Sequence, residues 1–309
     1  MEHTGLAPGQ WSITKFVMLA KNQAIERPIG LCSVAYKAWL QMRYPLVQAW
    51  LQGYEKVAPW DAAVPGVTCL SVSIARVFKC EVAVATGCHR ATLYLDLSTF
   101  YETLSHAKLI ESALTLDFPA SVLNIALQIY RGGRIIDAEG SMGPISFTDR
   151  GVIAGCPAAP ALSKLALYQP LKTVQETGLC AGLDSWIDDV TIDEEDKDPQ
   201  RAAQKIVSLY RTVSAELGHA ELKISTSKSA FVCTDRQTQW KMLKARSVEP
   251  TAAVKCFAPG PDPEWQSLFP QAPDCFKAQL QVRKTGIFTG EFLPDDNVYF
   301  GTDASGDVD

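Results

Sequence analysis

The 309-residue chain lacks several features that would assign it to a common class of protein. It has no run of 18 or more apolar residues, so the sequence predicts no membrane-spanning helix. Its N-terminus does not combine a charged start with an apolar core, and we therefore expect no secretory signal. None of the nine cysteines forms a C-x-x-C pair. We expect free thiols, which are typical of a reducing compartment inside the cell, either nucleus or cytoplasm.

An excess of positive charge is also missing, since the formal net charge is −5. Nucleic-acid-binding domains are usually basic, so the total charge alone does not indicate one. Acidic residues gather in residues 184–198, whereas Lys and Arg are spread over the remainder, and local patches rather than the total decide polyanion binding. The hydrophobic fraction of 47% is enough to fill a core.

Two adjacent carboxylates, Asp188 and Asp189, interrupt an apolar and β-branched stretch, SWIDDVTI over residues 185–192. Such a pattern predicts two short strands joined by a tight turn that carries the Asp pair. Two neighbouring buried carboxylates need a counter-ion, and Mg²⁺ prefers oxygen ligands of this kind. Alternatively, both aspartates are turn residues that face solvent, because Asp is favoured in turns.

Hydrophobic periodicity, together with Pro and Gly positions, predicts an alternation of strands and helices. We expect strands at residues 11–19, 27–32, 91–97, 221–224, 229–233 and 253–257, the second an edge strand or the start of a strand because of Pro28. We expect helices at 34–56 with a break at Pro45, 105–116, 119–130, 157–178 and 198–218, and 237–246 as a weaker candidate. Residues 67–84 fit either a strand or a short helix.

The central order of these elements matches a ferredoxin-like split βαβ sheet covered by helices on one face. In such a sheet the strand that ends at Asp96 lies beside the hairpin of Asp188 and Asp189. We therefore expect three carboxylates to converge and to hold two Mg²⁺ ions, roughly 3.5–4 Å apart, as in two-metal phosphoryl transfer.

Five segments, in order, resemble the motifs of reverse transcriptases, most closely those of non-LTR retrotransposons and group II introns. YLDLSTFYETL at residues 94–104 resembles motif A, RGVIAGCPAAP at 150–160 motif B, and WIDD at 186–189 motif C. LG at 217–218 through KISTSKS at 223–229 is similar to motif D, and Lys21 with RPIGL at 27–31 looks like the fingers strands. The resemblance covers about residues 15–235.

This resemblance implies an RNA-directed DNA polymerase with an α+β right-hand fold and a role for each matching residue. Asp96 and Asp188 would ligate two Mg²⁺ ions (Mn²⁺ as the alternative), with Asp189 as a less essential third ligand. Lys228 would neutralise the leaving pyrophosphate. The substrate-binding residues would be those that contact the dNTP: Lys21 and Arg27 at the triphosphate, Tyr101 as the gate against a 2′-hydroxyl, and Gly155 in the loop of motif B.

The resemblance also implies a domain order. We expect fingers and connection at residues 1–90, a ferredoxin-like palm at 91–235, and a reduced thumb or connection at 236–297. Residues 298–309 resemble the opening strand of a ribonuclease H domain, through Thr302-Asp303-Ala304-Ser305-Gly306. We therefore expect a piece of a longer polyprotein, with an endonuclease or ribonuclease H attached, that acts on an RNA template, a DNA primer and dNTPs and on no membrane.

Several positions depart from the family pattern, and three alternatives to an active reverse transcriptase stay open. Ala154 replaces a glutamine, Glu102 a second Asp, and Trp186 the usual Tyr or Phe. A catalytically degenerate relative that keeps only the fold is the first alternative. An RNA-templated RNA polymerase is the second. The third, from another class, is an acidic binding module that docks a partner through residues 184–198.

Overall fold

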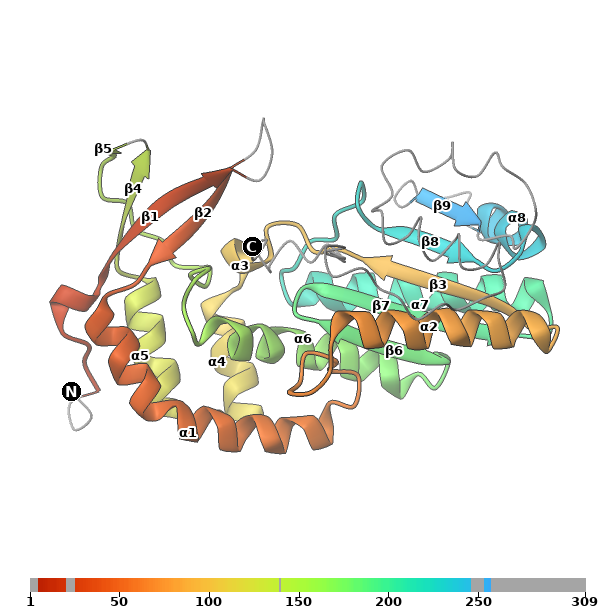
Figure 1. The fold of residues 1–309 in the computed structure, drawn as a ribbon, viewed down its shortest axis with the longest axis horizontal. Coiled ribbons are helices and arrows are strands. Elements are labelled where there is room, and N and C mark those ends of the chain that lie inside the picture. The colour runs from red at the N-terminus through yellow and green to blue at the C-terminus, as the bar shows by residue number, and fades with distance from the viewer. Residues whose placement is uncertain (1–4, 21–25, 139, 246–252, 257–309) are drawn as a thin grey trace, which may run out of the picture.

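A computed structural model describes residues 5–20, 26–138, 140–245 and 253–256 of the chain. It contains two β-sheets with helices between and around them, the mixed α+β class that the sequence predicts. Figure 1 shows one sheet at each end of the molecule, with helices α4 (His106–Thr115) and α6 (Ala159–Glu176) in the space between.

The smaller sheet has the strand order β2-β1-β4-β5. Strand β1 (Ile13–Ala20), preceded by a 3-10 turn at Gly9–Trp11, pairs antiparallel with β2 (Glu26–Leu31) and parallel with β4 (Gly133–Ala138). The short β5 (Ser141–Met142) closes the other edge. Strand β2 lies at an edge of this sheet, as Pro28 requires, because proline cannot donate a hydrogen bond to a second neighbour.

The larger sheet has the strand order β6-β7-β3-β8-β9 and carries the central motifs. Strand β3 (His89–Leu95) is central and runs antiparallel to both β7 (Asp189–Asp196) and β8 (Ala230–Cys233). Strand β6 (Gly182–Trp186) forms a hairpin with β7, and β9 (Ala253–Cys256) pairs parallel with β8.

Helices lie on both faces of this larger sheet. Helix α7 (Pro199–His219) covers the apolar face, where its Tyr210 ring meets the Phe231 ring edge-on at 5.5 Å, and α6 packs beside it. Tyr94 points to the opposite face, because it alternates with Leu93, the partner of Phe231 in the ladder. Arg76 of helix α2 (Cys69–Ala85) lies over the Tyr94 ring at 5.6 Å. The sheet is therefore covered on both faces, not on one as predicted.

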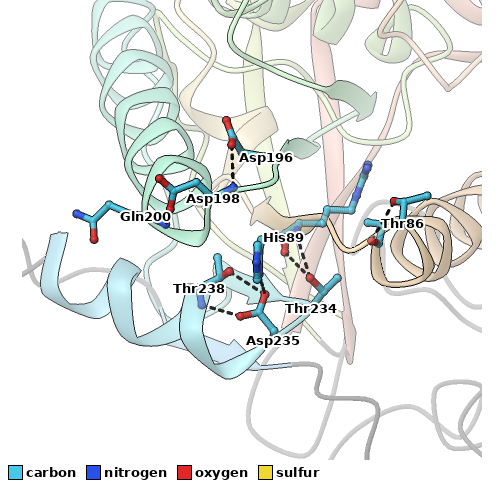
Figure 2. Close-up of polar contacts among 10 residues, drawn as sticks. Thr86, His89, Asp196, Asp198, Gln200, Thr234, Asp235 and Thr238 are labelled. Atoms are coloured by element: carbon cyan, nitrogen blue, oxygen red, sulfur yellow. Dashed lines mark hydrogen bonds and ion pairs between the residues drawn. The ribbon is translucent and has the colours of Figure 1, made fainter.

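The remaining helices surround the core. Helix α1 (Val34–Val57) and α5 (Ala120–Tyr130) pack against each other, and the short α3 (Phe100–Thr103) follows β3. Asp235 directly precedes helix α8 (Arg236–Ala245). Its carboxylate accepts the backbone N–H of Thr238 and contacts Nδ1 of His89 at 2.8 Å (Figure 2). Within the described part of the chain, no helix is both long and apolar enough to cross a membrane.

Two local expectations differ from the structure, and the structure decides a third that the sequence leaves open. Helix α1 continues through Pro45 because its buried aromatic and aliphatic side chains offset one lost backbone hydrogen bond. In the segment 67–84, which fits either a strand or a short helix, the structure has helix α2, and a capping box between Thr68 and Ser71 marks its start. The predicted strand at 221–224 is wrong: Glu221 has a left-handed φ of 63° in the turn after α7, and only Ile224 forms an isolated bridge, to Leu97.

Some expectations fall outside the described residues. Lys21, most of the predicted thumb (246–252 and 257–297) and the segment that resembles ribonuclease H (298–309) belong to this part of the chain. The domain boundaries proposed from the sequence therefore stay predictions.

Candidate active site

Asp96 directly follows strand β3 and is held by the segment that resembles motif D. Its carbonyl accepts the N–H of Ser225 at 2.8 Å, and its own N–H donates to Oγ of Ser229 at 3.1 Å. Nζ of Lys228 lies 3.3 Å from Oδ1 of the Asp96 carboxylate. The structure thus brings together Asp96 and Lys228, which the sequence assigned to one site.

The Asp pair lies at a two-residue hairpin turn, as predicted. Trp186 pairs with Asp189, so Ile187 and Asp188 form the turn itself. Ile187 adopts a left-handed φ of 55°, which is costly for a β-branched residue and is typical of functional turns. Asp188 is only 8% exposed, and the interpretation of a turn residue in open solvent therefore does not hold for it.

The ladder between β3 and β7 brings the hairpin to Asp96. Leu95 pairs with Val190, and the same register continued by one residue sets Asp96 opposite Asp189. Asp189 lies close enough to Cys69, the first residue of α2, for its charge, after burial, to raise the pKa of that thiol. The three aspartates therefore share one end of the sheet, although their sequence positions are far apart.

Their side chains do not form a three-ligand group in this arrangement. Among the described residues, no set of three His, Cys, Asp or Glu side chains is close enough to hold a metal ion. The expected convergence is therefore seen in the backbone register, and the role of the three as joint ligands stays a prediction.

The donor chemistry of the site nevertheless suits a hard cation. Oδ2 of Asp96 is buried and has no hydrogen-bond partner among the described residues. A buried polar atom of this kind needs an explanation, and a bound ion or water is a common one. Carboxylate oxygens are the preferred protein ligands of Mg²⁺. The residues present thus fit a divalent ion.

Tyr101 lies beside Asp188. Burial, and then the negative charge of Asp188, raise the pKa of the Tyr101 hydroxyl to about 12, while a hydrogen bond with Ser163 opposes the shift. The backbone carbonyl of Tyr101 accepts the N–H of Val152 at 2.7 Å. The backbone of Tyr101 is thereby joined to the loop after Arg150, and its hydroxyl lies near enough to Asp188 to be affected by that charge.

The loop that resembles motif B (residues 150–158) connects strand β2 with the segment around Tyr101. The carbonyl of Ala154 accepts the N–H of Gly30 at 2.8 Å. Gly155 has a φ of +98°, and a Cβ there would lie 2.9 Å from the Gly30 carbonyl oxygen. The close approach of backbone to backbone explains the need for glycine at this position. Its predicted contact with substrate is not tested by this geometry.

Arg27 lies half-buried on strand β2, opposite Leu19 of β1, on the same strand as Gly30. Its strand is thereby connected through the 150–158 loop to Tyr101 and the Asp96 region.

The acidic stretch 184–198 is largely engaged inside the molecule. Asp193, with a 1% exposed side chain, contacts Arg90 at 2.8 Å and accepts the hydroxyl of Thr92 at 2.6 Å. Other ion pairs of this stretch join Asp184 to Arg76, Glu195 to Arg90, Glu194 to Lys205, and Asp196 to Lys205 and Arg201. These contacts tie β6 and β7 to neighbouring elements, so the stretch does not offer a continuous acidic docking surface.

The sequence does not predict three of the contacts at this site. Ser229 accepts the Asp96 N–H, Ser163 bonds Tyr101, and His106 bonds the carbonyl of Gly151 at 2.8 Å. Ser229 adjoins Lys228 in a motif that the sequence identifies. Ser163 and His106 lie within ordinary helical patterns, and no local signal distinguishes them.

Two sheets, a central strand β3 followed directly by Asp96, and the adjoining Asp-Asp hairpin define a polymerase of the right-hand class. The chain belongs to the reverse transcriptase (RNA-dependent DNA polymerase) family, whose model matches residues 19–249. Reverse transcriptases are nucleotidyltransferases, so the family and enzyme class predicted from the sequence are confirmed.

Solved structures of similar fold include telomerases. The chain is 12% identical to the apo telomerase of Candida tropicalis truncated from its C-terminal domain, with a TM-score of 0.54, covering 74% of this chain and 51% of that one. It is 10% identical to the telomerase of Candida albicans in complex with a fragment of telomeric RNA, with a TM-score of 0.51 and coverages of 74% and 42%. These identities show a shared fold alone, and the chain spans about half the length of these telomerases or less. No curated protein matches it.

Proposed function

We propose that the chain is the polymerase domain of a retroelement and extends a DNA primer with dNTPs on an RNA template. The observation that carries this proposal is the ladder that sets Asp96 opposite Asp189, with Tyr101 against Asp188. The family match supports the reaction class. Attachment to an endonuclease or ribonuclease H within a polyprotein is part of the proposal.

Asp96, Asp188 and Asp189 would hold two divalent ions, Mg²⁺ or Mn²⁺. Bound there, the ions would lower the pKa of the primer 3′-hydroxyl and neutralise charge on the triphosphate. Lys228, beside Asp96 and half exposed, would offer its ammonium to the leaving pyrophosphate. Lys21 and Arg27 would bind the triphosphate oxygens, and Gly155 would let the loop approach the nucleotide closely.

Primer extension on an RNA template with dNTPs and Mg²⁺ tests this proposal. Asp188→Asn should abolish extension, because the amide cannot supply an anionic ligand. Asp184→Asn is the matched control: it lies in the same hairpin and loses an ion pair with Arg76, but lies away from the turn. Equal rates for wild type and Asp188→Asn would refute the proposal and would favour the degenerate relative.

Sugar selection is tested at Tyr101. A ring fixed beside Asp188 would exclude a 2′-hydroxyl by contact, so Tyr101→Ala should raise rNTP incorporation relative to dNTP incorporation. Tyr101→Phe, which keeps the ring, should retain the selection. A wild type that prefers rNTPs would instead identify an RNA-templated RNA polymerase.

A further inference from the structure

A buried histidine lies beneath the loop 150–158. His106 begins helix α4 and is 2% exposed. Its Nε2 lies 2.8 Å from the carbonyl oxygen of Gly151, and Nε of Arg131 lies 3.3 Å from its Nδ1. A guanidinium can only donate, so Nδ1 accepts from Arg131 and the proton resides on Nε2, which donates to Gly151. The hydrogen-bond network therefore assigns a neutral imidazole in a single tautomer.

Gly151 is the point at which this loop turns toward the proposed active site. It has a φ of +86°, and its N–H donates to the carbonyl of Leu104 at 2.8 Å. The next residue, Val152, donates to the Tyr101 carbonyl, and Ala154 accepts from Gly30 of β2. A displacement at Gly151 would therefore be transmitted to the sugar gate and to the strand of Arg27.

We propose that His106, oriented by Arg131, is a positioning residue that fixes Gly151 and thereby sets the walls of the nucleotide-binding site. This inference rests on the proposed polymerase function. His106 does not touch the aspartates or the nucleotide site itself, and acts through the loop. A purely structural histidine would change stability without changing the affinity for dNTPs.

The charged and titratable groups that face His106 give the proposal a pH signature. Burial, followed by Arg131 and Arg134, lowers the pKa of the imidazole, while the carbonyl of Gly151 and the more distant Asp149 act in the opposite sense. The ring also lies 6.4 Å from that of Tyr130. Protonation would place an N–H on Nδ1 against the donating guanidinium of Arg131. Acidification through the pKa of His106, which lies below the ordinary histidine value, should therefore loosen the loop.

Steady-state primer extension by the full chain tests the proposal with three variants. His106→Ala should raise the KM for dNTP roughly tenfold and change kcat less, because one buried hydrogen bond to the loop is lost. His106→Gln, whose amide can donate to Gly151 and accept from Arg131, should restore most of the affinity. His89→Ala is the matched control, because it loses the 2.8 Å contact of an imidazole with Asp235 at the end of β3 away from Asp96 (Figure 2). It should leave KM unchanged.

The pH profile and amide exchange complete the test. The KM of wild type should rise in acid, whereas that of His106→Gln should stay flat in this range. Amide hydrogens of Gly151 and Val152 should exchange roughly tenfold faster in His106→Ala than in wild type or His89→Ala.

Several outcomes would overturn the inference. An unchanged KM in His106→Ala, an equal rise in His89→Ala, or no rescue by glutamine would each show that the imidazole does not position the site. If wild type fails to extend primers, the proposed function fails instead. Amide exchange then decides the positioning role separately, and equal exchange in all variants would refute it.

Discussion

Gly155→Ala should destabilise the chain more than an alanine at another left-handed glycine. Gly155 combines a φ of +98° with a backbone neighbour, the Gly30 carbonyl oxygen, at 2.9 Å from the position of a Cβ. Real Cβ atoms do not approach an oxygen so closely, and backbone atoms cannot rotate away as the end of a side chain can. The loop 150–158 would have to move away from strand β2, which would break the contact between Gly30 and Ala154.

The magnitude follows from two contributions. A left-handed conformation costs a residue with a Cβ about 1–2 kcal/mol, and forcing extra volume into a packed site costs about 1–3 kcal/mol. Alanine also lowers the conformational entropy of the unfolded chain, which stabilises the fold by about 0.4–1 kcal/mol and offsets part of this cost. We therefore expect the free energy of unfolding to fall by about 2–4 kcal/mol, a large share of the total stability of a typical domain.

Gly66→Ala is the matched control. Gly66 has a similar φ of +85°, but nothing lies within 4 Å of the position of its Cβ. It should lose only the conformational contribution, about 1 kcal/mol. Urea unfolding of both variants and wild type, followed by circular dichroism, measures the difference. Equal losses in the two variants would refute the idea that close approach to β2 determines the glycine at 155.

Three further predictions address burial and charge. Asp193→Asn removes the anion that the buried Arg90 shares with the partly buried Arg76, and it should lower the free energy of unfolding by about 3–5 kcal/mol. Glu111→Gln, at an exposed ion pair, should cost less than about 1 kcal/mol; urea unfolding measures both. Asp188→Asn should lower the pKa of Tyr101 from about 12. Titration of the phenolate absorbance measures it, when the same titration of a Tyr101→Phe counterpart is subtracted to isolate Tyr101. An unchanged titration midpoint would contradict the proximity of Tyr101 to Asp188. Burial acts to raise the pKa of Asp235, but hydrogen bonds, chiefly from the backbone N–H of Thr238, lower it below its ordinary value. The ionised carboxylate therefore stabilises the fold above about pH 3.8, and this stabilisation is lost as the pH falls through the pKa of the folded state. In Asp235→Asn, the free energy of unfolding should depend less on pH in this range.

Local features of the sequence determined much of the fold. The hairpin of β6 and β7 follows from β-branched residues on both sides of an Asp pair, and the start of α7 follows from Asp198 and Pro199. Asp198 accepts the N–H of Gln200 at the N-cap, which is a contact within one turn. The edge position of β2 follows from Pro28. Each of these depends on neighbours within a few residues, so pattern and residue type are sufficient.

Other features depend on burial that no local pattern reports. Helix α1 continues through Pro45 because its side chains pack into a core built from distant segments. Helix α2 could not be distinguished from a strand, because its apolar residues are spread around the helix and its main polar contact, Arg76 with Asp184, spans more than 100 residues.

The candidate site shows the same division. The sequence by itself identified Asp96, the Asp188–Asp189 turn, Lys228 and the glycine loop, because each lies in a short motif with a recognisable order. Only the tertiary structure decided that Asp96 lies opposite Asp189, that Tyr101 lies beside Asp188, and that a histidine supports the loop. These relations are set by the register of β3 against β7 and by packing between helices, and both depend on the whole chain rather than on any one segment.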